Sequence, residues 1–147
     1  MQVLIHCLSK SESHRPFSKI KGLVQAIAFH PFRPLFFVAT QQTVFLYNLQ
    51  KQVNLSISSF SFQFFQSLIK KMISGSKSIS CISIHPEGDN VIVGTGDKRV
   101  VWFDIDLGSK PYKTFKYHNK SIRDVNFHPR YPLFASSDDD MNINIFQ

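Results

Sequence analysis

A His-Pro pair occurs three times in the 147-residue chain, each time between two runs of apolar residues. The three copies read FHPFRPLFF at 29–37, IHPEGDNVI at 84–92 and FHPRYPLFA at 127–135. A polar turn follows each second run and leads to a third run, which ends in an aromatic residue. Alternation of apolar and polar residues, rich in Val, Ile and Phe, predicts short β-strands. The chain is therefore predicted to repeat one unit of several strands.

The distance between the pairs gives the length of this unit. His85 and His128 are 43 residues apart, whereas His30 and His85 are 55 apart. A period of about 40–45 residues with several short strands is that of a WD repeat, which forms one four-stranded blade of a β-propeller. The first spacing is longer by 12 residues, which is the length of the Ser/Phe-rich stretch SISSFSFQFFQS at 56–67. We interpret that stretch as an insertion.

These observations predict an all-β fold, a partial WD40-type β-propeller. We expect about three blades, with repeats at roughly 22–55, 76–117 and 118–147 and the probable insert at 56–67. The stretch VLIHCLS at 3–9 is expected to be one strand of a preceding blade. No window shows a convincing helical pattern, and LIKKMI at 68–73 is the only ambiguous one. Open sheet edges present unpaired backbone groups, so we expect a chain of this length to hold part of a larger propeller.

The charge balance is basic, and its excess is uneven. The chain has 17 Lys and Arg against 10 Asp and Glu, which gives a net charge of +7. Residues 1–55 carry +5 of that excess. Such a balance fits an anionic partner such as RNA, but it equally fits plain solubility. Two isolated cysteines, Cys7 and Cys81, indicate a reducing compartment, and no apolar run approaches the roughly 18–20 residues that span a bilayer.

Three residues of the last repeat resemble a catalytic triad in type. His118 lies four residues before the predicted first strand, Ser136 lies on the second strand and Asp140 lies in the following turn. A hydrolase would use this combination, but WD repeats use the same residue types in a buried hydrogen-bond network that stabilises the blade. No Gly-x-Ser-x-Gly motif supports catalysis. We therefore predict a structural network and no catalytic residue.

The second repeat carries part of the same pattern. Thr95 and Asp97 match the polar positions of the second strand and the turn, but Lys77 stands where the histidine is expected. His30, His85 and His128 occupy one repeat position on separate blades, so they do not surround one ion. No Cys or His pair has the spacing of a zinc site, and we expect no metal and no cofactor.

Several basic residues and one tyrosine, expected at the surface, are candidates for contact with RNA or with a protein partner. Positioned cations are sufficient to bind RNA phosphates, and exposed aromatic residues often anchor protein partners. An ordinary solvated surface is the alternative, because nearby aspartates neutralise part of the charge. Trp102 alternates with Phe103 on a predicted strand, so we expect it to pack between blades. The candidate contacts are Lys98, Arg99, Lys113, Lys116, Lys120, Arg123, Arg130 and Tyr112.

Three motifs carry a more specific resemblance: GDNVIVG…DKRVVWFD, DLGSKPYKTFKYH and FHPRYPLFAS. Together they resemble the C-terminal WD-repeat propeller of the block-of-proliferation ribosome biogenesis proteins. The resemblance implies a non-catalytic scaffold in large (60S) ribosomal subunit assembly and pre-rRNA processing, in the nucleolus and nucleoplasm. It also implies a pescadillo-type protein, a second WD-repeat protein and pre-rRNA or the pre-ribosome as partners, with no membrane and no small-molecule substrate. A generic WD-repeat adaptor of another pathway is the alternative, and a hydrolase using His118, Ser136 and Asp140 is a remote one.

Overall fold

The computed structural model describes residues 5–7, 12–14, 20, 22–49 and 67–147. Every regular element in these residues is a β-strand, which confirms the predicted all-β class. The strands are β1 (Ile5–Cys7), β2 (Glu12–His14), β3 (Val24–Phe29), β4 (Leu35–Thr40), β5 (Thr43–Asn48), β6 (Ser67–Ile73), β7 (Ile79–Ile84), β8 (Asn90–Thr95), β9 (Val100–Asp104), β10 (Lys113–Phe115), β11 (Ile122–Phe127), β12 (Phe134–Asp138) and β13 (Ile143–Phe146).

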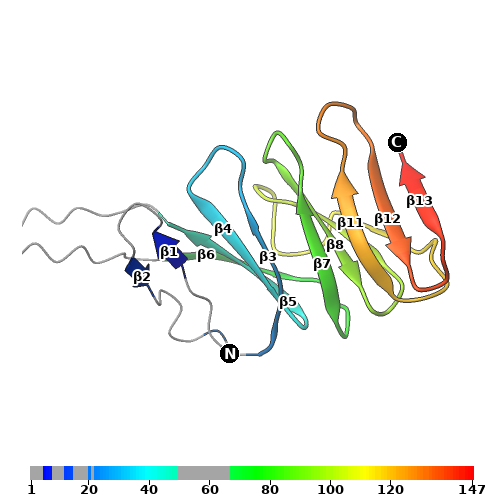
Figure 1. Ribbon diagram of the computed structural model, residues 1–147, viewed down its shortest axis with the longest axis horizontal. Coiled ribbons are helices and arrows are strands. Elements are labelled where there is room, and N and C mark those ends of the chain that lie inside the picture. Colours follow the sequence, from blue (N-terminus) through cyan, green and yellow to red (C-terminus); the bar gives the residue numbers. More distant parts are fainter. Residues whose placement is uncertain (1–4, 8–11, 15–19, 21, 50–66) are drawn as a thin grey trace, which may run out of the picture.

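The strands form three antiparallel sheets that lie side by side like the blades of a partial propeller (Figure 1). The first sheet has the strand order β3-β4-β5-β6, the second β7-β8-β9-β10 and the third β11-β12-β13. β1 and β2 form a separate two-stranded sheet. In the described residues β13 has one neighbour, β12, so the third sheet lacks the fourth strand that completes the other two.

Strand pairing shows which residues are equivalent in the three sheets. In each sheet the first residue of the inner strand (β3, β7 or β11) pairs with the last residue of the next strand. The register of the pairing then shifts at a β-bulge. A bulge adds one residue to one strand and raises the local twist. Because the bulge recurs at the same place, it aligns the sheets without reference to sequence similarity. The three pairs are Val24 with Thr40, Ile79 with Thr95, and Ile122 with Asp138.

The His-Pro pairs form the turns between the first two strands of each sheet. In the first sheet, the backbone amides of Phe32 and Arg33 donate to Nδ1 of His30 over 3.0 and 2.9 Å. In the third, the amides of Arg130 and Tyr131 donate to Nδ1 of His128, both over 3.0 Å. The imidazole thus satisfies amides that a tight turn would otherwise leave unpaired. The repeated histidines are structural caps of the turns.

Apolar side chains fill the two spaces between the sheets. One core cluster joins the first and second sheets through residues such as Phe37, Met72 and Phe103. The other joins the second and third sheets. There Trp102 lies 5.9 Å from Phe127 and 5.6 Å from Phe134 between ring centroids, which confirms the predicted packing between blades. Edge-on contacts between aromatic rings add to the stabilisation that burial provides.

The ambiguous stretch LIKKMI belongs to strand β6, the outer strand of the first sheet. The first blade therefore continues to Ile73, beyond the expected repeat limit near 55, while residues 56–66 of the proposed insert lie outside the described residues. None of the described residues forms a helix of the length and apolar character needed to cross a membrane.

Candidate functional site

The loops lie at two opposite ends of the three sheets, because neighbouring strands run in opposite directions. We call one end the His-Pro end; it comprises loops 30–34, 85–89, 105–112 and 128–133. The other is the turn end, which comprises loops 41–42, 74–78, 96–99, 116–121 and 139–142. Loops positioned on a rigid sheet scaffold are the usual place for binding residues.

Hydrogen bonds to backbone carbonyls hold the loops of the turn end next to one another. The amide of Gly96 donates to the carbonyl of Ser78 over 2.8 Å, and the hydroxyl of Ser121 donates to the carbonyl of Gly96 over 2.9 Å. The amide of Asp139 donates to the carbonyl of Ser121 over 3.0 Å. Four loops from the three sheets therefore form one continuous surface.

The predicted polar network lies just beneath this surface in the third sheet. Nε2 of His118 lies 2.6 Å from Oγ of Ser136, and Nδ1 lies 2.8 Å from Oδ2 of Asp138. The acidic member is thus Asp138 and not the expected Asp140. Asp140 lies exposed in the turn, and its backbone amide donates to Oδ1 of Asp138 over 2.9 Å. The strand register places Asp138 opposite Ile122, where its carboxylate points inward.

The pKa of Asp138 is held below its ordinary value. Burial of the carboxylate raises it, but the hydrogen bond from His118 and those from the backbone amides of Asn142 and Asp140 lower it by more, and the charge of His118 adds to the lowering. A carboxylate that accepts several hydrogen bonds is stabilised in its ionised form. The network therefore depends on an ionised Asp138.

This geometry has the connectivity of a catalytic triad but not its accessibility. The side chains of His118 and Asp138 are 1% and 0% exposed, and Ser136 is 2% exposed. The side-chain amide of Asn144 lies 3.4 and 3.3 Å from the two ring nitrogens of His118 and covers the imidazole further. A nucleophile must approach a substrate carbonyl directly, which a buried hydroxyl does not do. The arrangement stabilises the blade, as a satisfied buried network does.

The other two sheets lack this network. Thr40 and Thr95 take the place of Asp138, and each hydroxyl donates to a backbone carbonyl of its own turn, that of Thr43 over 3.0 Å and that of Arg99 over 2.8 Å. His118 lies four residues before Ile122, the first paired residue of the third sheet. The residue four before Ile79, the first paired residue of the second sheet, is Gly75, so Gly75 and not Lys77 is the equivalent of His118. A Cβ at Gly75 would meet no atom within 4 Å.

Asp97 is a second residue whose role differs from the expectation. It lies in the turn position equivalent to Asp140, and its Oδ2 lies 3.5 Å from Nε of Arg99. Its Oδ1 is buried and has no hydrogen-bond partner among the described residues. Because the second sheet has no histidine for it to approach, the polar pattern noted in the sequence does not assemble into a network there.

The candidate contact residues divide between the two ends. Arg123 pairs with Asp139 of the turn end, and Nζ of Lys113 lies over the ring of Phe115 on β10, 5.0 Å from its centroid. The loops of the turn end hold five basic and three acidic residues, whereas those of the His-Pro end hold three of each. The turn end carries Lys98, Arg99, Lys116 and Lys120, and the His-Pro end carries Arg130 and Tyr112.

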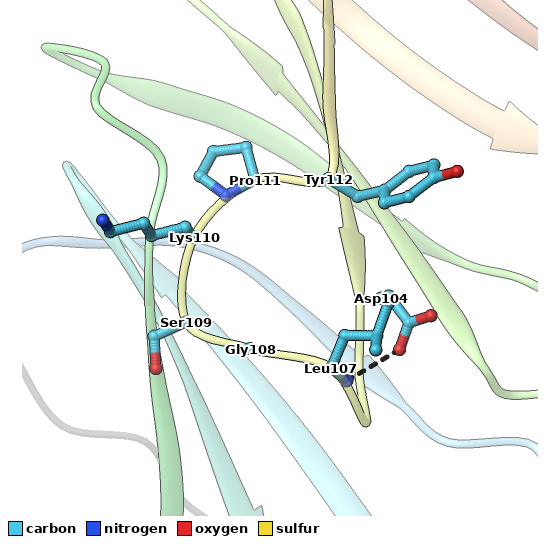
Figure 2. Close-up of a pocket in the computed structure, with 7 residues that line it drawn as sticks. All are labelled: Asp104, Leu107, Gly108, Ser109, Lys110, Pro111 and Tyr112. Carbon is cyan, nitrogen blue, oxygen red and sulfur yellow. Dashed lines mark hydrogen bonds between the residues drawn. The ribbon is translucent and has the colours of Figure 1, made fainter.

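A shallow hollow lies in the loop between β9 and β10, at the His-Pro end (Figure 2). Oδ1 of Asp104 accepts from the amide of Leu107 over 2.9 Å, and the carbonyl of Ser109 accepts from the amide of Ile73 in the first sheet over 3.1 Å. Leu107 and Tyr112 are 75% and 69% exposed beside it. The loop is thus held by both neighbouring sheets and leaves two large side chains, Leu107 and Tyr112, exposed.

Sequence reasoning did not single out a group at the tip of the second His-Pro turn. The ligand-type atoms of His85, Glu87 and Asp89 lie within 4.8 Å of one another. Nδ1 of His85 lies 2.9 Å from Oδ1 of Asp89, and this close contact accounts for the arrangement. The spacing HPEGD was the only signal for it. Both acidic residues are exposed, and the group is a turn contact.

Two four-stranded sheets and a three-stranded one, stacked through apolar faces, with a buried His-Ser-Asp network in the third, define a WD-repeat protein. The model of the WD domain, G-beta repeat, matches residues 66–104 and 109–147, and the chain belongs to this family. Over 96% of its length it is 49% identical to a ribosome biogenesis protein BOP1 homolog of Anopheles gambiae. It is 51% identical over 95% of its length to the BOP1 homologs of Drosophila willistoni and Drosophila virilis. The resemblance inferred from the motifs is confirmed.

The chain spans only 15–16% of the length of these relatives. The shared part corresponds to WD repeats, and nothing in the match concerns the remainder of those proteins. The activity and partners of the whole relatives are therefore matters of proposal for this chain.

Proposed function

We propose that this chain is a non-catalytic WD-repeat scaffold in ribosome biogenesis, acting in large-subunit assembly and pre-rRNA processing. The observation that carries the proposal is the 49–51% identity to ribosome biogenesis proteins, which extends over nearly the whole chain. The burial of Ser136 supports a role without chemistry, because the hydroxyl that a hydrolase would use is inaccessible.

The mechanism is the rigid display of loops at the two ends of the stacked sheets. At the turn end, Lys98, Lys116 and Lys120 are exposed and carry no aspartate partner among the described ion pairs. Positioned cations of this kind bind phosphates of pre-rRNA without reading its sequence. At the His-Pro end, Leu107 and Tyr112 offer an apolar contact to a protein, such as a pescadillo-type protein or a second WD-repeat protein. The place of action is the nucleolus and nucleoplasm.

A WD-repeat adaptor of another pathway is the second candidate, because the fold alone serves many partners. The experiment that separates the two is affinity purification of the endogenously tagged gene product, with sedimentation of its complexes and identification of the bound proteins and RNA. The proposal expects co-sedimentation with precursors of the large ribosomal subunit and recovery of pre-rRNA. Recovery with unrelated complexes alone, and no pre-rRNA above the untagged control, would refute it.

A further inference from the structure

Three loops meet at Gly96, in the middle of the turn end. The amide of Gly96 donates to the carbonyl of Ser78 over 2.8 Å, and its carbonyl accepts from the hydroxyl of Ser121 over 2.9 Å. A Cβ at Gly96 would lie 2.3 Å from Oγ of Ser78, so glycine is what lets these loops approach so closely. Gly96 lies in the second sheet, and the loops on both sides of it belong to the described residues. The meeting point therefore does not depend on the outer faces of the first and third sheets.

Each of the three loops places a lysine beside this meeting point. Lys77 precedes Ser78, Lys120 precedes Ser121, and Lys98 lies two residues after Gly96. All three lysines are exposed, and none of their ammonium groups has an ion pair or hydrogen bond with a described residue. We call Lys77, Lys98 and Lys120 the Gly96 lysines. Because a lysine ammonium is carried on a long flexible stem, the three can approach one anionic strand together.

The acidic residues near the meeting point are paired with arginines instead. Oδ2 of Asp97 lies 3.5 Å from Nε of Arg99, and Asp139 pairs with Arg123. Asp140, the remaining acidic residue of the turn end, lies in the turn of the third sheet. The Gly96 lysines therefore keep an uncompensated positive charge. A nucleic-acid backbone suits such a group, since its phosphates need only positioned cations.

The backbone of Lys98 gives independent support for a binding role. Its φ of +70° lies in the left-handed region, where glycine is favoured. The chain thus keeps a charged side chain at a position where glycine would relieve strain, and strained residues of this kind concentrate at binding sites. Met141, the equivalent residue of the third sheet, has a φ of +59° but no charge, so it offers a matched comparison.

We propose that the Gly96 lysines bind phosphates of one RNA strand, which crosses the turn end over the meeting point of the three loops. The inference rests on the proposed function, which expects an RNA contact at the turn end. It adds Lys77 to that contact and assigns the contact to one built site in place of dispersed charge. The group recognised is the sugar–phosphate backbone, because lysine point charges at phosphates carry no information about the bases.

The test measures binding of the full gene product to a labelled pre-rRNA fragment by fluorescence anisotropy over a series of salt concentrations. Changing any one of the Gly96 lysines to Gln should weaken binding by about five-fold and lower the salt slope by about one. Changing all three should lower the slope by about three. The matched control combines Lys110→Gln, Lys113→Gln and Arg130→Gln, which removes the same charge away from the turn end and should weaken binding by less than about two-fold.

Two further pairs of variants test the geometry of the site. Gly96→Ala leaves the charge unchanged but forces the loops apart, so it should weaken RNA binding about as much as the loss of one lysine. Gly108→Ala should not, because its Cβ meets no atom closer than 3.9 Å. Lys98→Gly should raise the melting temperature and still weaken binding, whereas Met141→Gly should raise the melting temperature alone.

The outcomes separate this site from the proposed function. A triple lysine variant that binds like the wild type, or no more weakly than its control, would overturn the site while the wild type still binds RNA. Tighter binding of a doubly phosphorylated serine peptide than of the RNA would overturn the choice of RNA. A wild type that does not bind the fragment would refute the RNA contact of the proposed function as well. Trp102 fluorescence reports folding of each variant, because Trp102 lies between two sheets, and the lysine variants decide the matter if Gly96→Ala does not fold.

Discussion

Nε2 of His30 in the first sheet donates to the carbonyl oxygen of Gly88 in the second sheet over 2.9 Å. Nδ1 of the same ring accepts from two amides of its own turn, so the ring nitrogens have opposite roles and the neutral tautomer is defined. His30 is 6% exposed. One side chain therefore closes a turn within one blade and connects that blade to the next.

Gly88 is the residue at which this contact is most sensitive to substitution. Its φ of +79° lies in the left-handed region, and a Cβ there would lie 2.3 Å from the ring of His30. We expect Gly88→Ala to lower the free energy of unfolding by about 2–4 kcal/mol, from backbone strain together with overpacking. Urea denaturation followed by Trp102 fluorescence measures the change.

Gly108→Ala is the control for that substitution, because the nearest atom to its added Cβ is 3.9 Å away. We expect it to leave the denaturation midpoint nearly unchanged. Equal effects of the two substitutions would show that the contact between His30 and Gly88 does not join the sheets as described.

The network of His118 predicts a difference between two neighbouring serines. Ser136→Ala removes the hydroxyl 2.6 Å from Nε2 of His118 and leaves that buried nitrogen with only the longer 3.3 Å contact to Asn144, which should cost about 1–3 kcal/mol of stability. Ser137 points to the opposite side of the strand, so Ser137→Ala should cost much less. Thermal unfolding of the two variants tests this. A destabilisation no greater for Ser136→Ala than for Ser137→Ala would contradict it.

The low pKa of Asp138 predicts how acid affects stability. Because its folded-state pKa lies below the ordinary value near 3.8, the unfolded chain binds the proton more readily. The contribution of Asp138 is therefore complete above that value and is lost as the pH falls below it toward the folded-state pKa. Urea midpoints measured between pH 6 and pH 3 should decline more steeply for the wild type than for Asp138→Asn. Parallel curves would show that Asp138 is not the group responsible.

The proposed RNA contact predicts a difference between the two ends of the molecule. Lys98→Glu combined with Lys120→Glu at the turn end should weaken binding of a pre-rRNA fragment by about ten-fold or more, with a smaller salt dependence. Lys110→Glu combined with Arg130→Glu makes the same charge change at the His-Pro end and should have little effect. Filter binding over a series of salt concentrations distinguishes the two. The reverse order would place the RNA contact at the His-Pro end.

The strands and the turns between them were accessible to sequence reasoning where a residue pattern has one physical meaning. Alternating apolar residues around His30, His85 and His128 predicted the strands and their turns, because a His-Pro pair ends a strand by removing a backbone donor. Trp102 was expected between blades for a similar reason, since neighbouring strand residues face opposite sides. The extent of the first blade was not accessible, because LIKKMI at 68–73 fits a helix as well as the outer strand it forms.

The members of the polar network were only partly accessible. The sequence predicted His118 and Ser136 correctly. It indicated Asp140 as the acidic member, where the structure has Asp138, and it indicated Lys77 as the equivalent of His118, where the structure has Gly75. Gly75 lies four residues before Ile79, as His118 lies four before Ile122, so the same offset would have identified it from the sequence. The error at Asp140 comes from counting along the chain. The β-bulge after Ile122 and the turn at 139–142 change which carboxylate faces inward, and those features depend on strand pairing.

The sequence by itself determined the repeat, the strand pattern and the membership of a WD-repeat family, since these depend on local periodicity and on motif identity. Only the tertiary structure decided that Ser136 is a buried support and not a nucleophile, because solvent access depends on the packing of separate strands. Only the tertiary structure showed that the basic residues lie at two opposite ends of the sheets, because antiparallel pairing places consecutive loops at opposite ends.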